Sequence, residues 1–171
     1  PFLCRAARGA ARFADDFGWI DSEKLIAYLG YYKRNQYDEK SGLYFWQNDI
    51  MTCIDNNPTV FCRPPRSSAD IFLNCFIYLE YTALATILKA KGDVRADKAG
   101  AEAEKLSRAI NLEMWDGRDG IYYSQDISFS RSDFSAGGVK LHSGMPPHWN
   151  GMPLKIRIWA CFLPMYAGIC S

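Results

Sequence analysis

The 171-residue chain has no marked excess of charge of either sign, because 20 Lys and Arg residues oppose 19 Asp and Glu residues and leave a formal net charge of +1. No stripe of basic residues is present, so we expect no nucleic-acid partner. A Gly-rich phosphate loop and an alternation of strands with helices are also missing, which disfavours nucleotide binding. The longest apolar run, Ile158 to Ala167, is broken by Pro164 and is too short to cross a bilayer, so we expect no membrane partner.

Metal-binding motifs are missing as well. Only two histidines, His142 and His148, accompany six cysteines, and no two cysteines form a Cys-x-x-Cys pair. Since no spaced carboxylate loop for calcium occurs either, we expect no metal and no cofactor. Most thiols lie among apolar residues, which favours buried free cysteines and a cytoplasmic protein; disulfide bonds in an exported protein are the alternative. The cysteines are Cys4, Cys53, Cys62, Cys75, Cys161 and Cys170.

Hydrophobic residues make up 49% of the chain and aromatic residues 15%, and this composition indicates a large buried interior. The length is sufficient for one domain with a core. The sequence opens at Pro1 with no initiating Met, and it stops at Ser171, soon after an apolar stretch that nothing follows to cover. We therefore interpret residues 1–171 as a single segment of a longer domain, incomplete at both ends. The alternative is a complete chain with a processed N-terminus and a disordered tail.

Three amphipathic helices are predicted from apolar residues that recur every three or four positions. The first covers residues 2–17 and can end at Gly18, the second begins at a cap at Asp21 or Ser22 and ends near Gln36, and the third covers residues 95–114. The residues expected to face inward are Leu3, Ala6, Ala10, Phe13 and Phe17 in the first helix, Leu25, Leu29 and Tyr32 in the second, and Ala99, Ala103, Leu106 and Ile110 in the third.

Two further helices are predicted to be buried on nearly all sides. Residues 68–91 are apolar all round, which is typical of a core helix; the helix begins at Ser67 or Ser68 with Asp70 in its first turn. Asp70, Asn74 and Tyr81 share one face, where they either bond the backbone of the preceding loop or line a polar pocket. Residues 154–167 are predicted to form the second buried helix, bent or ended by Pro164.

Long loops separate these helices at residues 37–67 and 124–153, and connections of this length are usually functional. Residues 115–123 have the pattern of a helix end, a tight turn and a short strand, which predicts a short β-hairpin. Surface helices alternate with buried helices along the chain, and this order is typical of an α/α toroid. The predicted fold class is therefore all-α: part of a toroid of helices with long loops and a short β-hairpin.

The first loop and the start of the following helix, residues 41–78, concentrate the polar and aromatic groups that bind sugars. A sugar ring stacks its C–H face on an aromatic ring, and its hydroxyls need paired donors and acceptors. Loops on a rigid scaffold are where such groups collect. The alternative is a surface loop with an Asx turn at residues 55–58. The aromatic groups are Tyr44, Phe45 and Trp46, and the polar groups are Gln47, Asn48, Asp49, Asp55, Asn56 and Asn57.

Four motifs follow one another along the chain: residues 42–46 leading to 54–58, residues 68–74 with Tyr81 and 83–85, residues 115–123, and residues 159–169. In this order they resemble the motifs of inverting (α/α)6-barrel glycosidases. The family comprises glycoside hydrolase family 63 and the mannosylglycerate and glucosylglycerate hydrolases, within the trehalase and glucoamylase type of clan. The chain departs from the family at Ile54, where the family has Met, and at Asn57, where it has Ser.

The resemblance implies hydrolysis of an α-glycosidic bond, such as an α-glucoside, with inversion, and it assigns the general acid to Asp55. Inversion needs a second carboxyl across the scissile bond. The family's general base is a Glu near the end of the barrel; no element of this chain matches it, so we expect the base outside residues 1–171, with Asp70 and Asp133 as fallback carboxylates. For Asp55 to be protonated near neutral pH, burial near groups such as Trp46 and Ile54 must raise its pKa.

The expected partners are a carbohydrate substrate and the remainder of the barrel, supplied by the same longer chain or by a second copy. Trp46 is the expected stacking surface. Arg63 and Arg66 either bind the anionic end of a sugar-glycerate or brace the loop against Asp70 or backbone carbonyls. The expected substrate-binding residues are Tyr44, Phe45, Trp46, Gln47, Asn56, Asn57, Arg63, Arg66, Asp70 and Asn74.

Two other classes of function fit the same sequence. One is a non-catalytic helical module that binds carbohydrate or serves as a scaffold, for which sugar binding without hydrolysis is expected. The other is a transferase or phosphorylase on the same fold. Hydrolysis with an inverted product distinguishes the glycosidase from both.

Overall fold

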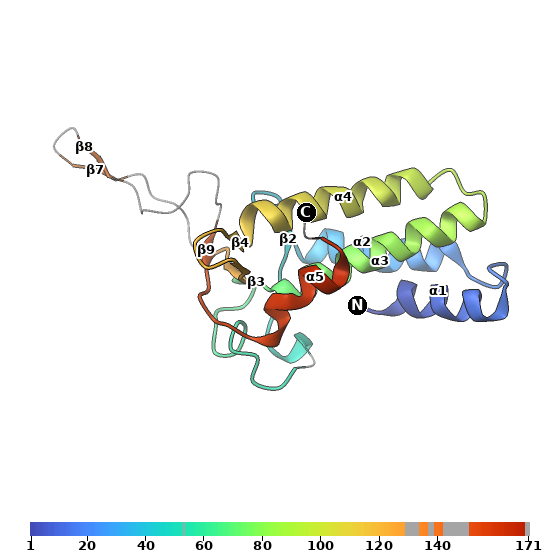
Figure 1. Ribbon diagram of the computed structural model, residues 1–171, viewed down its shortest axis with the longest axis horizontal. Coiled ribbons are helices and arrows are strands. Elements are labelled where there is room, and N and C mark those ends of the chain that lie inside the picture. Colours follow the sequence, from blue (N-terminus) through green and yellow to red (C-terminus); the bar gives the residue numbers. More distant parts are fainter. Residues whose placement is uncertain (53, 129–133, 137–138, 142–150, 170–171) are drawn as a thin grey trace.

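A computed structural model of the protein describes residues 1–52, 54–128, 134–136, 139–141 and 151–169 (Figure 1). Within these residues the chain is mostly helical, which confirms the coarse fold class. The α-helices are α1 (Leu3–Ala14), α2 (Ser22–Asn35), α3 (Ile71–Ala90), α4 (Ala96–Glu113) and α5 (Leu163–Ala167), and the 3-10 helices are η1 (Ile50–Thr52) and η2 (Trp159–Phe162).

Short antiparallel strands join the helices, most of them at the end of the molecule where α3 begins and α4 ends (Figure 1). The hairpin expected in residues 115–123 is confirmed as β4 paired with β5. A three-stranded sheet in the order β3-β6-β9 was not predicted, because its strands have two residues each and lie far apart in the sequence. The strands are β1 (Tyr37–Asp38), β2 (Leu43–Tyr44), β3 (Ser68–Ala69), β4 (Trp115–Asp116), β5 (Ile121–Tyr122), β6 (Gln125–Asp126), β7 (Phe134–Ala136), β8 (Val139–Leu141) and β9 (Met152–Pro153).

Helix α3 is the centre of the core, and α1, α2, α4 and α5 all pack against it (Figure 1). Its side chains Ile71, Leu73, Ile77 and Ile87 are fully buried, so the prediction of a core helix is confirmed. Each such side chain stabilises the fold by roughly 1.5–3 kcal/mol relative to exposure. By length and apolar composition alone α3 could also cross a bilayer, but 72% of its most apolar window is buried inside this fold, as in the core helix of a soluble protein.

Helices α2 and α4 follow their sequence patterns closely. The Asp21 carboxylate accepts hydrogen bonds from the amides of Glu23 and Lys24 at 3.1 and 3.2 Å, which confirms the predicted cap of α2. The inward residues predicted for α4, Ala99, Ala103, Leu106 and Ile110, are all buried. In both helices the repeat of apolar residues matches the face that meets α3.

The prediction of which face of α1 is buried is wrong. Cys4 and Ala11 are the buried residues, whereas Leu3 is half exposed and Phe13 is 95% exposed. Small side chains on the buried face let α1 approach α3, and Glu80 of α3 fixes the start of the helix by accepting hydrogen bonds from its first amides. The helix also ends earlier than predicted, because Asp15 adopts a left-handed conformation (φ 52°) directly after Ala14.

The helix predicted over residues 154–167 is also wrong. Strand β9 and the hydrogen bond from the Leu154 amide to the Ser124 carbonyl (2.8 Å) hold the start of this segment extended. Helical structure begins only at η2, and Pro164 lies in the first turn of α5, where its missing N–H costs nothing. Trp159, Phe162 and Met165 are exposed, so this segment is not a second buried helix.

Cys4, Cys62 and Cys161 have free thiols, as predicted. Cys4, Cys75 and Cys161 are buried and Cys62 is exposed, so burial is confirmed for three of these four. Cys53, Cys170 and both histidines lie outside the described residues.

Candidate functional site

A cavity of about 380 Å³ opens in the loop between β2 and β3, and it contains the residue to which the resemblance assigns acid catalysis. Its volume lies in the range of small-ligand sites. The lining combines two carboxylates, two amides, a hydroxyl and apolar groups, which is a mixture suited to a polyhydroxylated ligand. The lining residues are Asp49, Ile50, Thr52, Ile54, Asp55, Asn56, Asn57 and Phe61.

Asn57 holds this loop against the start of α3. Its Nδ2 donates to the Asp70 carboxylate at 3.1 Å, and its Oδ1 accepts from the Thr59 amide at 3.1 Å. The Thr59 hydroxyl lies within hydrogen-bonding distance of both the Asn57 and Asp70 side-chain oxygens. Through these bonds Asn57 fixes the loop, and it also lines the cavity, so substrate binding by its side chain stays a prediction.

Asp70 was predicted to lie in the first turn of α3. In the structure it is instead the N-cap, the residue directly before the helix. Its carboxylate accepts hydrogen bonds from the amides of Phe72 (2.7 Å) and Leu73 (3.3 Å) in addition to those from Asn57 and Thr59. Burial raises the pKa of this carboxyl above its ordinary value, and the four hydrogen bonds oppose that shift. A fully buried carboxylate with both oxygens bonded cannot contact substrate or activate a water, so both roles predicted for Asp70 are wrong.

Asn74 and Tyr81 also bond the loop. The Asn74 side chain accepts a hydrogen bond from the Tyr44 amide at 2.7 Å and donates one to the Tyr44 carbonyl at 2.8 Å. These are the two backbone bonds that a neighbouring strand would otherwise make with this residue of β2. The Tyr81 hydroxyl pairs with the Tyr44 hydroxyl at 3.1 Å, and burial raises the pKa of both phenols. The first alternative is therefore confirmed for Asn74, which bonds the loop backbone, whereas Asp70 and Tyr81 bond side chains of the loop. None of the three lines the cavity.

The three aromatic residues expected to bind sugar are buried beneath the loop. Tyr44 and Phe45 are buried, and Trp46 is only 4% exposed. Tyr44 and Trp46 belong to the hydrophobic core that surrounds α3. Their predicted role as stacking surfaces is wrong in this structure, because packing against the core covers the ring faces.

The two loop arginines are braces, but not with the partners proposed from the sequence. Arg63 forms an ion pair with Asp126 of β6, and both side chains are largely buried. The exposed Arg66 places its guanidinium carbon 5.3 Å from the centre of the Phe45 ring, a cation–π contact. Arg63 therefore ties the loop to β6, and Arg66 covers the Phe45 ring.

Asp55 lies in the cavity but is exposed, so the burial among Trp46 and Ile54 that acid catalysis requires is not present in the described residues. Asn56 is exposed beside it with a positive φ of 54°, a conformation that asparagine tolerates well. Gln47 is half-buried and does not line the cavity. Of the predicted site residues, the structure brings Asp55, Asn56 and Asn57 together here.

Two further residues line the cavity: Asp49, which the sequence offered only as one of the polar groups of the loop, and Phe61, which had no predicted role. Asp49 places a second carboxylate in the cavity with Asp55. Phe61 is 46% exposed, which makes it an accessible aromatic ring beside these carboxylates. No pattern in the sequence distinguishes either residue from its neighbours, because both lie in an irregular loop without any periodicity.

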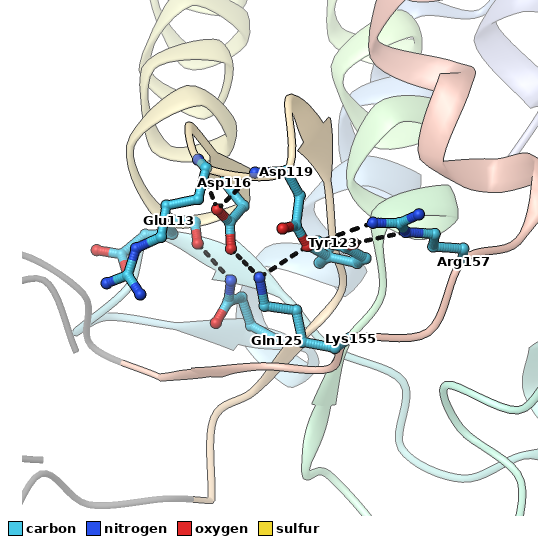
Figure 2. Close-up of polar contacts among 8 residues, drawn as sticks. Glu113, Asp116, Asp119, Tyr123, Gln125, Lys155 and Arg157 are labelled. Carbon is cyan, nitrogen blue, oxygen red and sulfur yellow. Dashed lines mark hydrogen bonds and ion pairs between the residues drawn. The ribbon is translucent and has the colours of Figure 1, made fainter. Parts of the chain in front are cut away.

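A second polar cluster lies where the β4–β5 hairpin meets the segment before η2 (Figure 2). Lys155 forms ion pairs with Asp116 and with Asp119, the latter at 2.9 Å. The Tyr123 hydroxyl donates to Asp119 at 2.7 Å and accepts from Arg157 Nε at 3.0 Å. We call Asp116, Asp119, Tyr123, Lys155 and Arg157 the hairpin clasp, since they join two segments more than 30 residues apart in the sequence.

The hairpin clasp predicts a pH dependence of stability. The bond with Lys155 holds the pKa of Asp116 below its ordinary value, and bonds with Tyr123 and Lys155 do the same for Asp119. Lowered carboxyl pKa values mean that the stabilisation is complete above about pH 4 and is lost as the pH falls through the folded-state values. The pKa of Lys155 is raised, so the same stabilisation is also lost as the pH rises through that value, above about 10.5.

We therefore expect Lys155→Met to lower the free energy of unfolding slightly at pH 6 and not at all near pH 2. The effect is small because Lys155 is half exposed and water screens the pair. Urea unfolding of both proteins across this pH range measures the difference. A difference that is the same at pH 2 and pH 6 would contradict the ion-pair account, and Lys98→Met, on the surface of α4, is the control.

In the described residues, no group of three or more His, Cys, Asp or Glu side chains is arranged to hold a metal ion.

Comparison with known proteins gives a likeness of fold. No protein-family model matches the sequence, and no curated protein matches it. Among solved structures the chain is similar to a sialidase, a glycosidase, with a TM-score of 0.54 and 19% sequence identity. The similarity covers 61% of this chain and 9% of that chain, so this chain spans only a small part of the neighbour's length. At this identity the similarity shows a shared helical fold.

Proposed function

We propose that residues 1–171 are part of an inverting glycosidase of the (α/α)6-toroid type, resembling glycoside hydrolase family 63, and that it acts on an α-glucoside or a related α-glycoside. The observation that carries the proposal is the exposed Asp55 in a ligand-sized cavity, on a loop that Asn57 and Asp70 tie to the start of the core helix. The mostly helical fold and its likeness to a glycosidase support it.

In this proposal Asp55 protonates the leaving oxygen while a carboxylate on the opposite side of the sugar activates water. In inverting enzymes the two carboxyls are about 6.5–9.5 Å apart, which leaves room for that water. Asp70 is excluded as the base by its burial. Asp133, the other fallback carboxylate, lies outside the described residues. The base is therefore proposed to come from the remainder of the toroid, in the same longer polypeptide or a second copy.

The remainder of the toroid also has a second role in this proposal. Asp55 is exposed here, and an acid that works near neutral pH needs burial to raise its pKa. Helices that pack over the open side of the cavity would exclude water from Asp55. The exposed apolar residues Phe162 and Met165, which line one pocket beside η2 and α5, offer apolar surface for contact with further protein.

The exposure of Asp55 also favours a second candidate, a helical carbohydrate-binding module without chemistry. The two are distinguished by following the natural polypeptide that contains these residues with aryl α-glucosides by proton NMR. The glycosidase proposal expects release of glucose whose first-formed anomer is β. Release of the α-anomer would contradict inversion, and sugar binding without hydrolysis would favour the binding module.

A further inference from the structure

The aromatic ring available to a ligand in the Asp55 cavity belongs to Phe61. The Phe61 side chain is 46% exposed and lines the cavity, whereas Trp46 is buried and does not line it. A large apolar side chain that remains exposed among the polar groups of a cavity is typical of a ligand contact. Phe61 therefore takes the place that the sequence pattern had assigned to Trp46.

Phe61 and Asp55 are held by the same anchored turn. The Phe61 and Val60 amides both donate to the Asn57 carbonyl, at 2.7 and 3.0 Å, and Val60 is buried. On the other side of the turn, the Asn57 amide donates to the Ile54 carbonyl at 3.4 Å, so Asp55 lies within the preceding turn. Since the Asn57 side chain is bonded to Asp70 and Thr59, the relative positions of Phe61 and Asp55 are fixed from within the fold.

The charge of the cavity limits which sugars it accepts. Asp49 and Asp55 contribute two carboxylates, and no Lys or Arg is among the lining residues in the described part of the chain. Of the two arginines that the sequence offers for an anionic sugar, Arg63 is paired with Asp126 and Arg66 lies over the Phe45 ring, and neither lines the cavity. A carboxylate-bearing sugar placed here would meet the Asp49 carboxylate beside the Asp55 carboxyl, with no compensating cation among the described lining residues, which is unfavourable.

We propose that this cavity binds a neutral sugar ring, with its C–H face on Phe61 and its hydroxyls on Asp55 and Asn56, and that it rejects sugar acids. This inference rests on the proposed function for its choice of ligand class. Phe61 is a binding and specificity residue, not a catalytic one, because an apolar ring supplies neither a proton nor a charge. Its edge hydrogens and face are suited to the alternating C–H groups of a pyranose.

The test measures sugar affinity by calorimetry in the natural polypeptide, so that it does not depend on hydrolysis. The probes are methyl α-D-glucopyranoside, which is neutral, and methyl α-D-glucopyranosiduronate, which differs by a carboxylate. We expect the neutral sugar to bind at least about tenfold more tightly than the acid. Phe61→Ala and Phe61→Leu should each lower the affinity for the neutral sugar about tenfold. Phe61→Tyr, which keeps an aromatic ring, should leave that affinity near the wild-type value.

The matched control is Phe13→Ala, which removes a 95% exposed phenylalanine on α1, outside the cavity, and should leave affinity unchanged. Wild-type affinity in both Phe61→Ala and Phe61→Leu, tighter binding of the acid, or the absence of any sugar binding would each overturn the inference. Failure of the proposed function is a different result: sugar binding that depends on Phe61, with no hydrolysis of any α-glycoside.

Discussion

Replacing Asp55 by asparagine is expected to lower the turnover number of the natural polypeptide on an alkyl α-glucoside by about 10²- to 10⁴-fold. The substitution keeps the size of the side chain but removes the proton that the leaving oxygen must receive. Because Asp55 is exposed and no described residue depends on its carboxylate for a hydrogen bond in this structure, the free energy of unfolding should change by less than about 0.5 kcal/mol. Steady-state kinetics and urea unfolding on the same preparations measure the two quantities.

The choice of leaving group makes this test specific for acid catalysis. Fluoride leaves without protonation. The loss of rate caused by Asp55→Asn should therefore be much smaller on α-glucosyl fluoride than on an alkyl α-glucoside. The control is Asp49→Asn, which removes the other carboxylate from the same cavity. Equal losses on both substrates, or a larger loss in Asp49→Asn than in Asp55→Asn, would contradict the role of Asp55 as the acid.

The helices that the sequence predicts well are those whose buried face is determined by their own residues. Leu25 and Leu29 of α2, and Leu106 and Ile110 of α4, are large apolar side chains that must be buried wherever the helix packs. Asp21 caps α2 through contacts only two and three residues away. Each of these features is local, so a single sequence contains the information.

The candidate site was predicted less well, because long-range contacts decide which of its side chains stay accessible. The aromatic run at residues 44–46 is in the loop, as expected, but Asn74 pairs with the backbone of Tyr44 and draws these residues into the core. Asn57 and Asp70 lie 13 residues apart in the sequence, and their side chains are joined by a hydrogen bond. Composition identifies the loop as rich in sugar-binding groups, but it does not distinguish the groups that hold the loop from those that face the cavity.

Helix α1 is the clearest failure of the sequence pattern, and Glu80 is its physical cause. The apolar stripe of α1 includes Phe13, which is exposed, so burial of that stripe does not orient the helix. Instead the Glu80 carboxylate, fully buried on α3, accepts hydrogen bonds from the amides of Cys4 at 2.7 Å and Arg5 at 3.0 Å. The residue before the helix, Phe2, provides no side-chain cap. A carboxylate 75 residues away therefore caps the helix and sets which face meets the core.

Glu80→Gln is accordingly expected to lower the free energy of unfolding by about 3 kcal/mol, near the lower end for loss of a buried charged partner. The amide keeps the volume, but it places an NH₂ group opposite N–H donors and removes the negative charge that the positive end of the helix dipole favours. Burial and the neighbouring Glu80 charge raise the pKa of the Cys4 thiol, so that thiol is protonated at neutral pH and does not replace the lost charge.

The measurement is urea unfolding combined with hydrogen exchange, in which the Cys4 and Arg5 amides should lose protection before those of α3. Glu104→Gln, on the surface of α4 with a side chain that is 76% exposed, is the matched control and should change stability by less than about 0.5 kcal/mol. If Glu80→Gln were as stable as this control, the buried carboxylate would not be the cap. The orientation of α1 would then have to come from apolar packing, in which Cys4 and Ala11 are buried and Phe2 contacts the rings of Phe72 and Phe76.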